Sequence, residues 1–230
     1  MSTDFSTLGI MQLSDSFFPT GAYTLSHGLE MLHRQKIVAA PEQVSELIKT
    51  FLENQIGPAD CVAMANAYDC AKDNDISGLV RVDKILNQTR LVQQQRDSSA
   101  RQGRQLIKCI LEISDYGLAR NMQEKINSMQ TPGTYPIALA VASDFFKIPK
   151  HESCLSLLYG FTVGVLGAAL RLGIISHTQS QKILYDLKPI MSRQVQENIL
   201  KSTDQIWQFV PYLEIFQMMH EKLETKMFVT

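Results

Sequence analysis

Apolar residues recur at intervals of three and four positions along most of the chain, and no other feature constrains the fold as strongly. Val44, Leu47, Ile48, Phe51 and Leu52 form one such stripe. Residues three and four apart share one face of an α-helix, so each stripe predicts a helix with one buried side. No segment of any length alternates polar and apolar residues as a half-buried strand does. The pattern predicts an all-α, single-domain helical bundle of roughly ten helices over residues 1–230, with flexible ends at about 1–7 and 224–230.

Prolines and capping residues predict where several helices begin and end. Pro41 and Pro58 each suit the first turn of a helix, where a missing N–H group breaks no hydrogen bond. Asp75 is placed to cap the helix that follows it. The segment 129–136 holds two prolines and a glycine and is the clearest break in the chain. Pro211 should end or kink the last helical region.

The stretch 153–170 carries no charged side chain and approaches the length of a membrane span. Its many small residues, and Arg171 directly after it, favour a tightly packed buried helix instead. Gly160, Gly164 and Gly167 fall along one face of that helix, where each glycine costs about 1 kcal/mol relative to alanine. Close approach of another helix would compensate for this cost. That helix belongs either to the same chain or to a second subunit.

Charge and cysteine content exclude several classes of protein. The chain has 22 basic and 23 acidic residues without a long run of like charge, so the electrostatic signature of a nucleic-acid binder is missing. The four cysteines are scattered and form no Cys-x-x-Cys pair, which is typical of reduced thiols. The N-terminal stretch has an acid and no basic residue, unlike a signal peptide. We therefore expect a cytoplasmic protein.

A search for catalytic motifs finds none. The sequence has no Gly-x-x-x-x-Gly-Lys-Ser/Thr loop for a nucleotide and no Gly-x-Ser-x-Gly nucleophile motif. No two histidines lie three or four positions apart, so no single helix presents a histidine pair to a metal ion. We expect a protein that is not an enzyme and has no catalytic, cofactor-binding or metal-binding residues of its own.

One loop has two possible interpretations. Asp15, Ser16, Pro19 and Gly21 lie in a predicted loop together with several aromatic residues, among them Tyr23. The loop is either a helix–loop–helix corner whose aromatic side chains fill the core, or a contact loop for a partner.

The region after the glycine-containing helix has an adequate local explanation. Thr178 and Gln181 have the spacing of a capping box. Arg171 ends an apolar helix, where a positive charge interacts favourably with the helix dipole. Neither feature by itself requires a functional role.

Together these segments resemble the F-type urease accessory proteins, whose opening signature is close to Leu-x-Asp-Ser-x-x-Pro-x-Gly-x-aromatic-x-x-Ser-x-Gly-Leu-Glu. The chain matches this signature from Leu13 to Glu30. The other matching segments are Arg96 to Gly103, Tyr135-Pro136, Arg171-Leu172-Gly173, Thr178 with Gln181, and His220-Glu221. The chain departs from the family pattern at Met219 and Lys226, where the family commonly has arginine.

The resemblance implies an adaptor. Such proteins are all-helical homodimers that bind a D/H-type scaffold protein and a G-type GTPase that carries nickel, and the assembly delivers nickel to apo-urease. The resemblance implies no firmly bound cofactor, because the complex handles the nickel. The charge distribution and the small residues of 153–170 lead us to expect no nucleic-acid and no membrane partner. The candidate interface residues are Asp15, Ser16, Pro19, Gly21, Tyr23, Glu30, Arg171, Gln181, His220, Glu221, Lys226 and Phe228.

Two further expectations concern the partner contact and the alternative function. The chain ends carry aromatic residues such as Phe5 and Phe228, and we expect both ends to contact the D/H-type partner. The alternative to an adaptor is an all-helical enzyme or small-molecule binder with a site near Asp15, His27 and Glu30.

Overall fold

The structure is a computed structural model that describes residues 3–15, 18–21 and 24–229. Its helices are α1 (Thr3–Ser14), α2 (Leu29–Arg34), α3 (Pro41–Phe51), the π-helix η2 (Leu52–Cys61), α4 (Val62–Lys72), α5 (Ile76–Thr89), α6 (Gln93–Ile113), α7 (Gly117–Asn127), α8 (Tyr135–Phe145), α9 (Lys150–Arg171), α10 (His177–Asn198), the short 3-10 helix η3 (Thr203–Gln205) and α11 (Pro211–Glu221). None of the described residues forms a strand. The predicted all-α bundle is confirmed.

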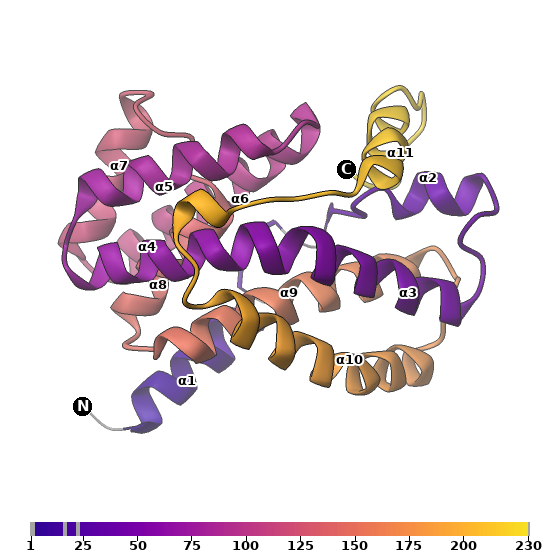
Figure 1. Cartoon of the computed structure of the whole chain (residues 1–230), viewed down its shortest axis with the longest axis horizontal. Coiled ribbons are helices and arrows are strands. Elements are labelled where there is room, and N and C mark those ends of the chain that lie inside the picture. The colour runs from indigo at the N-terminus through magenta and orange to yellow at the C-terminus, as the bar shows by residue number, and fades with distance from the viewer. Residues whose placement is uncertain (1–2, 16–17, 22–23, 230) are drawn as a thin grey trace.

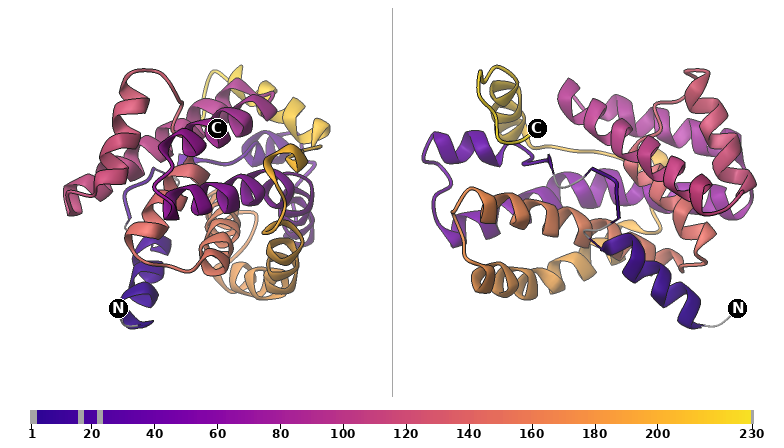
Figure 2. Two further views of the ribbon diagram at one scale, coloured as in Figure 1. Left: turned by 60° about the vertical axis from the view of Figure 1, so that its left-hand side comes forward. Right: turned by 180° about the vertical axis from the view of Figure 1, so that it is seen from behind.

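Helices α3, η2 and α4 form one continuous rod through the molecule (Figure 1). The predicted apolar stripe Val44, Leu47, Ile48 and Phe51 is the buried face of α3. Helices α5 and α8 pack on α4, and α6 and α7 complete that half of the bundle. Helices α9 and α10 pack on α3 and η2, while α11 packs on α2 near the far end of the rod (Figures 1 and 2).

The break predicted near residue 132 is a loop held by one buried carboxylate. Asp83 of α5 is fully buried and accepts hydrogen bonds from the Thr131 hydroxyl (2.6 Å) and the Gly133 N–H group (2.7 Å). It also accepts hydrogen bonds from the N–H group and the hydroxyl of Thr134, at 2.9 and 2.5 Å. An acceptor with this many donors fixes both the course of the loop and the start of α8.

The Arg96–Gly103 stretch of α6 holds the same loop from its other side. The Ser99 hydroxyl oxygen accepts a hydrogen bond from the N–H group of Tyr135 at 3.1 Å. A Cβ atom on Gly103 would lie 2.7 Å from the backbone of Thr134 and closer still to the carbonyl oxygen of Gly133. Glycine is therefore required at position 103 because the loop backbone lies directly on the helix.

Two predictions about prolines are wrong, and one about a capping residue is confirmed. Pro58 lies inside η2 rather than at the start of a separate helix, because the wider π-helical turns accommodate a residue without an N–H group. Pro211 begins α11 instead of ending a helix, since it occupies the first turn. Asp75 caps α5 as predicted, and its side chain accepts a hydrogen bond from Gly78.

The capping box predicted for Thr178 and Gln181 lies two positions earlier. The Ser176 hydroxyl accepts a hydrogen bond from the N–H group of Gln179 (3.3 Å), and the Gln179 side chain accepts one from the N–H group of Ser176 (2.7 Å). Helix α10 therefore begins at His177. The cap explains neither Thr178 nor Gln181, and both are exposed.

Within the described residues, α9 is the one helix that is long and apolar enough to cross a membrane. Half of the most apolar 18-residue segment of α9 is buried in the fold, and the core helix of a soluble protein can be equally long and apolar. No described atom lies within 4 Å of a Cβ position on Gly160 or Gly164, and Gly167 meets only Arg171. These glycines line a cavity of the same chain, and no other described helix lies against them, so the close approach of a helix stays a prediction.

Candidate functional site

Glu30 is the point at which distant parts of the chain meet. It is the last residue of the N-terminal signature, lies in α2 and is 1% exposed. Its carboxylate accepts a hydrogen bond from Arg34 at 2.9 Å and contacts the imidazole of His220 at 3.0 Å. It also accepts hydrogen bonds from the backbone N–H groups of Met227 (3.1 Å) and Phe228 (3.2 Å). One side chain thus connects α2, α11 and the C-terminal segment.

The hydrogen bonds around Glu30 keep its carboxylate ionised. Burial alone acts to raise the pKa of Glu30, but the hydrogen bonds from His220, from the two backbone N–H groups and from Arg34 outweigh it. The pKa therefore lies below its ordinary value of 4.5. Because an ionised carboxylate can only accept, the contact requires a proton on Nε2 of His220.

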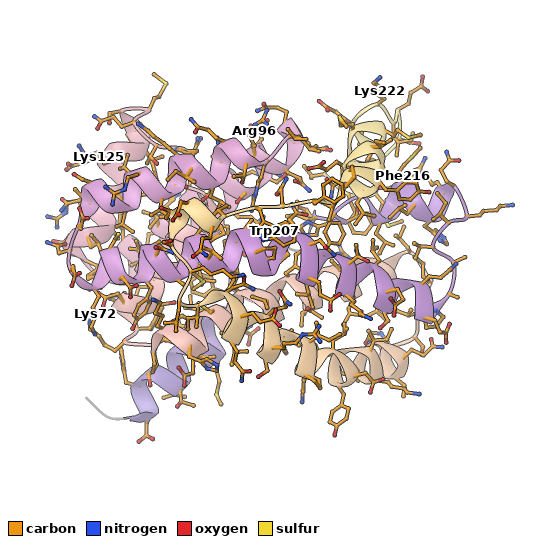
Figure 3. The ribbon with its side chains drawn as sticks, viewed as in Figure 1. Lys72, Arg96, Lys125, Trp207, Phe216 and Lys222 are labelled. Carbon is orange, nitrogen blue, oxygen red and sulfur yellow. The ribbon has the colours of Figure 1, made fainter. Side chains whose placement is uncertain are left out.

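His220 reaches Glu30 because α11 turns one face inward, beside α2. The buried residues of α11 are Leu213, Glu214, Phe216, Gln217 and His220. Figure 3 labels Phe216 on this helix. The neighbouring Glu221 is exposed, and its backbone carbonyl accepts a hydrogen bond from Nζ of the exposed Lys226 at 2.8 Å. The His-Glu pair of the sequence is therefore split between a buried contact and the surface.

The C-terminal segment after α11 folds back onto α2 and the end of α9. Phe228 is 3% exposed, and the guanidinium carbon of Arg171 lies 4.4 Å from the centre of its ring, a cation–π arrangement. Arg171 also donates a hydrogen bond from Nε to the carbonyl of Gly167 at 3.0 Å. Arg34 donates a hydrogen bond to the carbonyl of Thr225 at 2.8 Å. The mobility expected for residues 224–230 stays a prediction.

We call Glu30, Arg34, Arg171, His220 and Phe228 the tail cluster. Four of its members are predicted interface residues, and they come from three separate matching segments and the chain end. The structure therefore brings Glu30, Arg171, His220 and Phe228 together by contacts within one chain. Their side chains hold the C-terminal segment in place. The C-terminal segment and α11 cover these side chains and form the protein surface at this point.

The remaining predicted residues lie elsewhere. Asp15, Pro19 and Gly21 are exposed in the loop between α1 and α2, where Gly21 has a left-handed backbone (φ 79°). This loop meets the C-terminal segment, because the N–H group of Val229 donates to the carbonyl of Thr24 at 2.9 Å. Ser16 and Tyr23 lie outside the described residues. Gln181 is exposed on α10 and is not part of the tail cluster.

A cavity of about 580 Å³ lies beside the tail cluster, between the loop that follows α1 and helices α6, α8 and α9. Its lining includes Asp15, His27 and Arg171 but not Glu30. The volume is within the range of small-molecule sites. However, the group proposed for the alternative function, Asp15, His27 and Glu30, is not gathered around it. The carboxylate of Glu30 is already engaged in the tail cluster.

The wall of this cavity contains an ion pair that the sequence reasoning missed. Asp60 of η2 and Arg90, after α5, are both buried and bonded to each other. Burial raises the pKa of Asp60 despite the opposing effect of Arg90. A sequence signal existed, because Asp60 is the only charged residue between positions 54 and 68. A lone charge in such a run is typically buried and paired.

His27 lies in the same wall and is held neutral. Its ring packs against that of Phe161, with the centroids 4.8 Å apart. Burial, and then the positive charge of Arg90, lower the pKa of His27 to about 4. The carbonyl of His27 accepts a hydrogen bond from the side chain of Gln217 at 3.2 Å, which links the signature to α11.

No group of three or more His, Cys, Asp or Glu side chains is placed to hold a metal ion within the part of the chain that the structure describes. The tail cluster contains one histidine and one carboxylate, and these bind each other. Its chemistry is that of ionic and cation–π contacts that fix the shape of a surface.

Comparison with known proteins gives the family. A family model described as UreF matches residues 38–188. The chain is 30% identical over 221 residues to the urease accessory protein UreF of Trichodesmium erythraeum, which covers 96% of this chain and 95% of that protein. It is 30% identical over 222 residues to urease accessory protein UreF 1 of Brucella melitensis, with 96% and 92% covered. It is 27% identical over 219 residues to urease accessory protein UreF of Yersinia enterocolitica, with 95% and 96% covered. The chain therefore belongs to the UreF family of urease accessory proteins.

Proposed function

We propose that this chain is an adaptor in the incorporation of nickel into apo-urease, which binds a D/H-type scaffold protein and a G-type nickel GTPase. Membership of the UreF family supports a role in urease maturation, and the relatives are named as accessory rather than catalytic proteins. The individual partners are inferred from the resemblance of the signature and of the C-terminal residues. The protein acts in the cytoplasm and binds neither nucleic acid nor a membrane.

The observation that carries this proposal is the tail cluster with the surface above it. The cluster fixes the C-terminal segment and α11 from below through buried hydrogen bonds. Exposed apolar side chains occupy the outer side of the same elements: Tyr212, Ile215, Met218, Met219 and Met227. Aromatic and methionine side chains on a rigid base are typical of protein–protein contacts. We assign this face to the D/H-type scaffold.

The open face of α9 supports a homodimer. No described atom outside the helix lies within 4 Å of the Cβ positions of Gly160 and Gly164, which line the cavity of about 580 Å³ together with the exposed Val163. An uncharged helix face with small residues allows the backbone of a second helix to approach closely. A second copy of this chain is the proposed neighbour.

Nickel is handled by the complex rather than by this chain alone. His220, beside Glu221, is the best local ligand pair in the sequence, but the imidazole of His220 is directed to Glu30 instead. We therefore propose that this chain binds no cofactor firmly.

The experiment that tests the scaffold contact replaces exposed residues and leaves the tail cluster intact. Deletion of the residues after Glu224 is a poor test, because it also removes the buried Phe228 and two hydrogen bonds to Glu30. The double variant Tyr212→Ala with Met227→Ala changes only exposed side chains. We expect about tenfold weaker binding of the purified scaffold protein, measured by calorimetry. The melting temperature should fall only slightly, through loss of the ring contact between Tyr212 and Phe216 (centroids 4.8 Å apart).

The matched control is Leu200→Ala, which removes an exposed apolar side chain at the end of α10. The control should bind the scaffold like the unchanged protein. Full-strength binding by the double variant would show that the scaffold contacts another face.

A further inference from the structure

Met129 presents a large apolar side chain to the surface. It follows α7 and is 92% exposed, the highest value among the described large apolar side chains. Its backbone is left-handed, with φ of 56°. This residue closes the C-terminal end of α7, where the N–H groups of Met129 and Gln130 donate to the carbonyls of Ile126 and Lys125, both at 2.9 Å. The cap explains the backbone, whereas the exposed side chain contributes no burial free energy to its own chain.

The loop that follows Met129 is rigid. Asp83 holds Thr131, Gly133 and Thr134 through the hydrogen bonds described above, and Gly103 places the loop directly on α6. A surface that is already ordered loses little conformational entropy when a partner binds. The loop therefore presents Met129 on a fixed support.

Basic side chains surround the loop. Lys84 of α5 and Arg104 of α6 line a cleft of about 300 Å³ together with Met129 and Pro132. Nε of Arg104 donates to the carbonyl of Pro132 at 3.0 Å, which places the guanidinium at the cleft. Lys125 of α7 reaches the adjacent Gln130 at 3.1 Å. The residues that line the cleft include no acid.

The surrounding helices are also basic, in contrast to the rest of the chain. Residues 76–132 contain nine basic and five acidic residues, a surplus of four positive charges, although the whole chain has a net charge of -1. Asp83 is buried in the loop clamp. Glu112 and Asp115 are already paired with Lys108 and Arg120. Arg90 is neutralised by Asp60, which lies outside this range, so the surplus is three, and none of the ion pairs among the described residues involves Lys84, Arg104 or Lys125.

We propose that Met129, Lys84, Arg104 and Lys125 form a second docking surface, for an acidic segment of a partner protein that carries an apolar side chain. The apolar side chain of the partner packs on Met129, and its carboxylates pair with Lys84, Arg104 and Lys125. A nucleic-acid backbone fits less well, because it offers no apolar group to Met129 and is repelled by the negative net charge of the chain.

This surface lies on the half of the bundle away from α11, as the labels Lys125 and Lys222 in Figure 3 indicate. An adaptor needs two surfaces that can be occupied together, so the biological role of the second surface rests on the proposed function. Its chemistry follows from the loop and its charges alone.

The experiment uses the full chain with Lys84→Glu and Met129→Asn. Neither side chain makes a contact that holds the fold, and asparagine tolerates the left-handed backbone. The matched control is Lys182→Glu, an exposed charge reversal on α10. The probe is a fluorescein-labelled peptide of alternating glutamate and leucine, followed by anisotropy at low and high salt, with heparin as a polyanion without apolar groups. The scaffold, the GTPase and apo-urease are then titrated singly.

We expect the double variant to bind the peptide about tenfold more weakly, to lose most of the salt dependence, and to weaken the binding of one maturation protein by a similar factor. The control should match the unchanged protein. Equal binding by the double variant, or preference for heparin over the peptide, would overturn the proposal. If the surface proposal alone is wrong, binding that depends on Tyr212 and Met227 persists. If the proposed function is wrong, the unchanged chain binds none of the three proteins.

Discussion

Nε2 of His220 lies 3.0 Å from Oε2 of Glu30, although 190 positions separate the two residues in the chain. The contact joins α11 to α2, and both side chains are buried. The same carboxylate receives the N–H groups of Met227 and Phe228. Removal of one partner from such a group leaves buried polar atoms without hydrogen bonds, which costs more than the contact itself contributes.

Glu30→Gln should destabilise the protein by about 2–3 kcal/mol, because the new amide NH₂ group faces donors instead of accepting from them. The free energy of unfolding in urea measures this loss. Hydrogen exchange should also become faster at residues 225–229. The control Glu221→Gln changes the exposed neighbour of His220 and should alter the unfolding free energy by less than about 0.5 kcal/mol. An unchanged unfolding midpoint for Glu30→Gln would refute the role of the carboxylate.

His27 should make the protein less stable as the pH falls from 6.5 to 4. The unfolded chain takes up a proton near the ordinary pKa of 6.5, whereas the folded chain resists protonation until about 4. Between these two values the unfolded state binds more protons than the folded state, so the free energy of unfolding rises with pH. The contribution of His27 is fully present above pH 6.5. The contribution is no more than about 3 kcal/mol.

Unfolding titrations at a series of pH values test this prediction against His27→Asn, which tolerates the left-handed backbone of that position (φ 53°). The variant should show a flatter dependence between pH 6.5 and 4.5. Glu30 makes a separate contribution to the pH dependence. Because folding lowers the pKa of Glu30 from its ordinary value of 4.5, its contribution to the stability is lost as the pH falls below 4.5 and through the folded pKa. Parallel curves for the two proteins would exclude His27 as the titrating group.

Arg171→Ala should weaken the docking of the C-terminal segment. The guanidinium lies over the ring of Phe228, and loss of this contact should cost about 1 kcal/mol. Urease activation should fall in proportion, since Arg171 acts through the position of that segment. Arg171→Lys should recover only part of the loss, because lysine lacks the planar group that stacks on the ring. Activation at the full level by a normally stable Arg171→Ala protein would remove the residue from the site.

Gly103→Ala and Gly160→Ala form a matched pair. At position 103 the new methyl group would meet the loop backbone at 2.7 Å or less, so a loss of about 3 kcal/mol is expected. At position 160 no described atom lies within 4 Å, so alanine should stabilise the monomer by about 0.5–1 kcal/mol through its helix propensity. Sedimentation should show a weaker dimer for Gly160→Ala if α9 pairs with a second copy. Equal unfolding midpoints for the two variants would contradict the close contact at Gly103.

Nickel should bind the isolated chain weakly, through groups that the dimer brings together. Nickel binds imidazole and carboxylate ligands well, but the described residues hold no group of three such side chains. Calorimetric titration of the monomer with nickel measures the affinity. A nanomolar site with one ion per chain would show that a ligand set has been overlooked.

Local signals in the sequence predicted the helices that carry a clear apolar stripe or cap. The stripe from Val44 to Phe51 is the buried face of α3, and Asp75 caps α5. These features depend on residues within one or two turns of each other, so the sequence contains the whole signal. The prolines were harder, since Pro58 and Pro211 permit either the start or the interruption of a helix. The hydrogen bonds of the neighbouring backbone groups decide whether a helix begins or continues at the proline.

The sequence by itself determined that the chain is all-helical and, through its signature, which family it resembles. Only the tertiary structure decided that Glu30, Arg171, His220 and Phe228 meet, and that Asp60 is paired with Arg90. Both clusters depend on how whole helices pack on one another, α11 on α2 and the end of α5 on η2. Contacts between residues so far apart in the chain produce no periodic pattern in the sequence. The free energy that selects these contacts comes from burying one helix face against another.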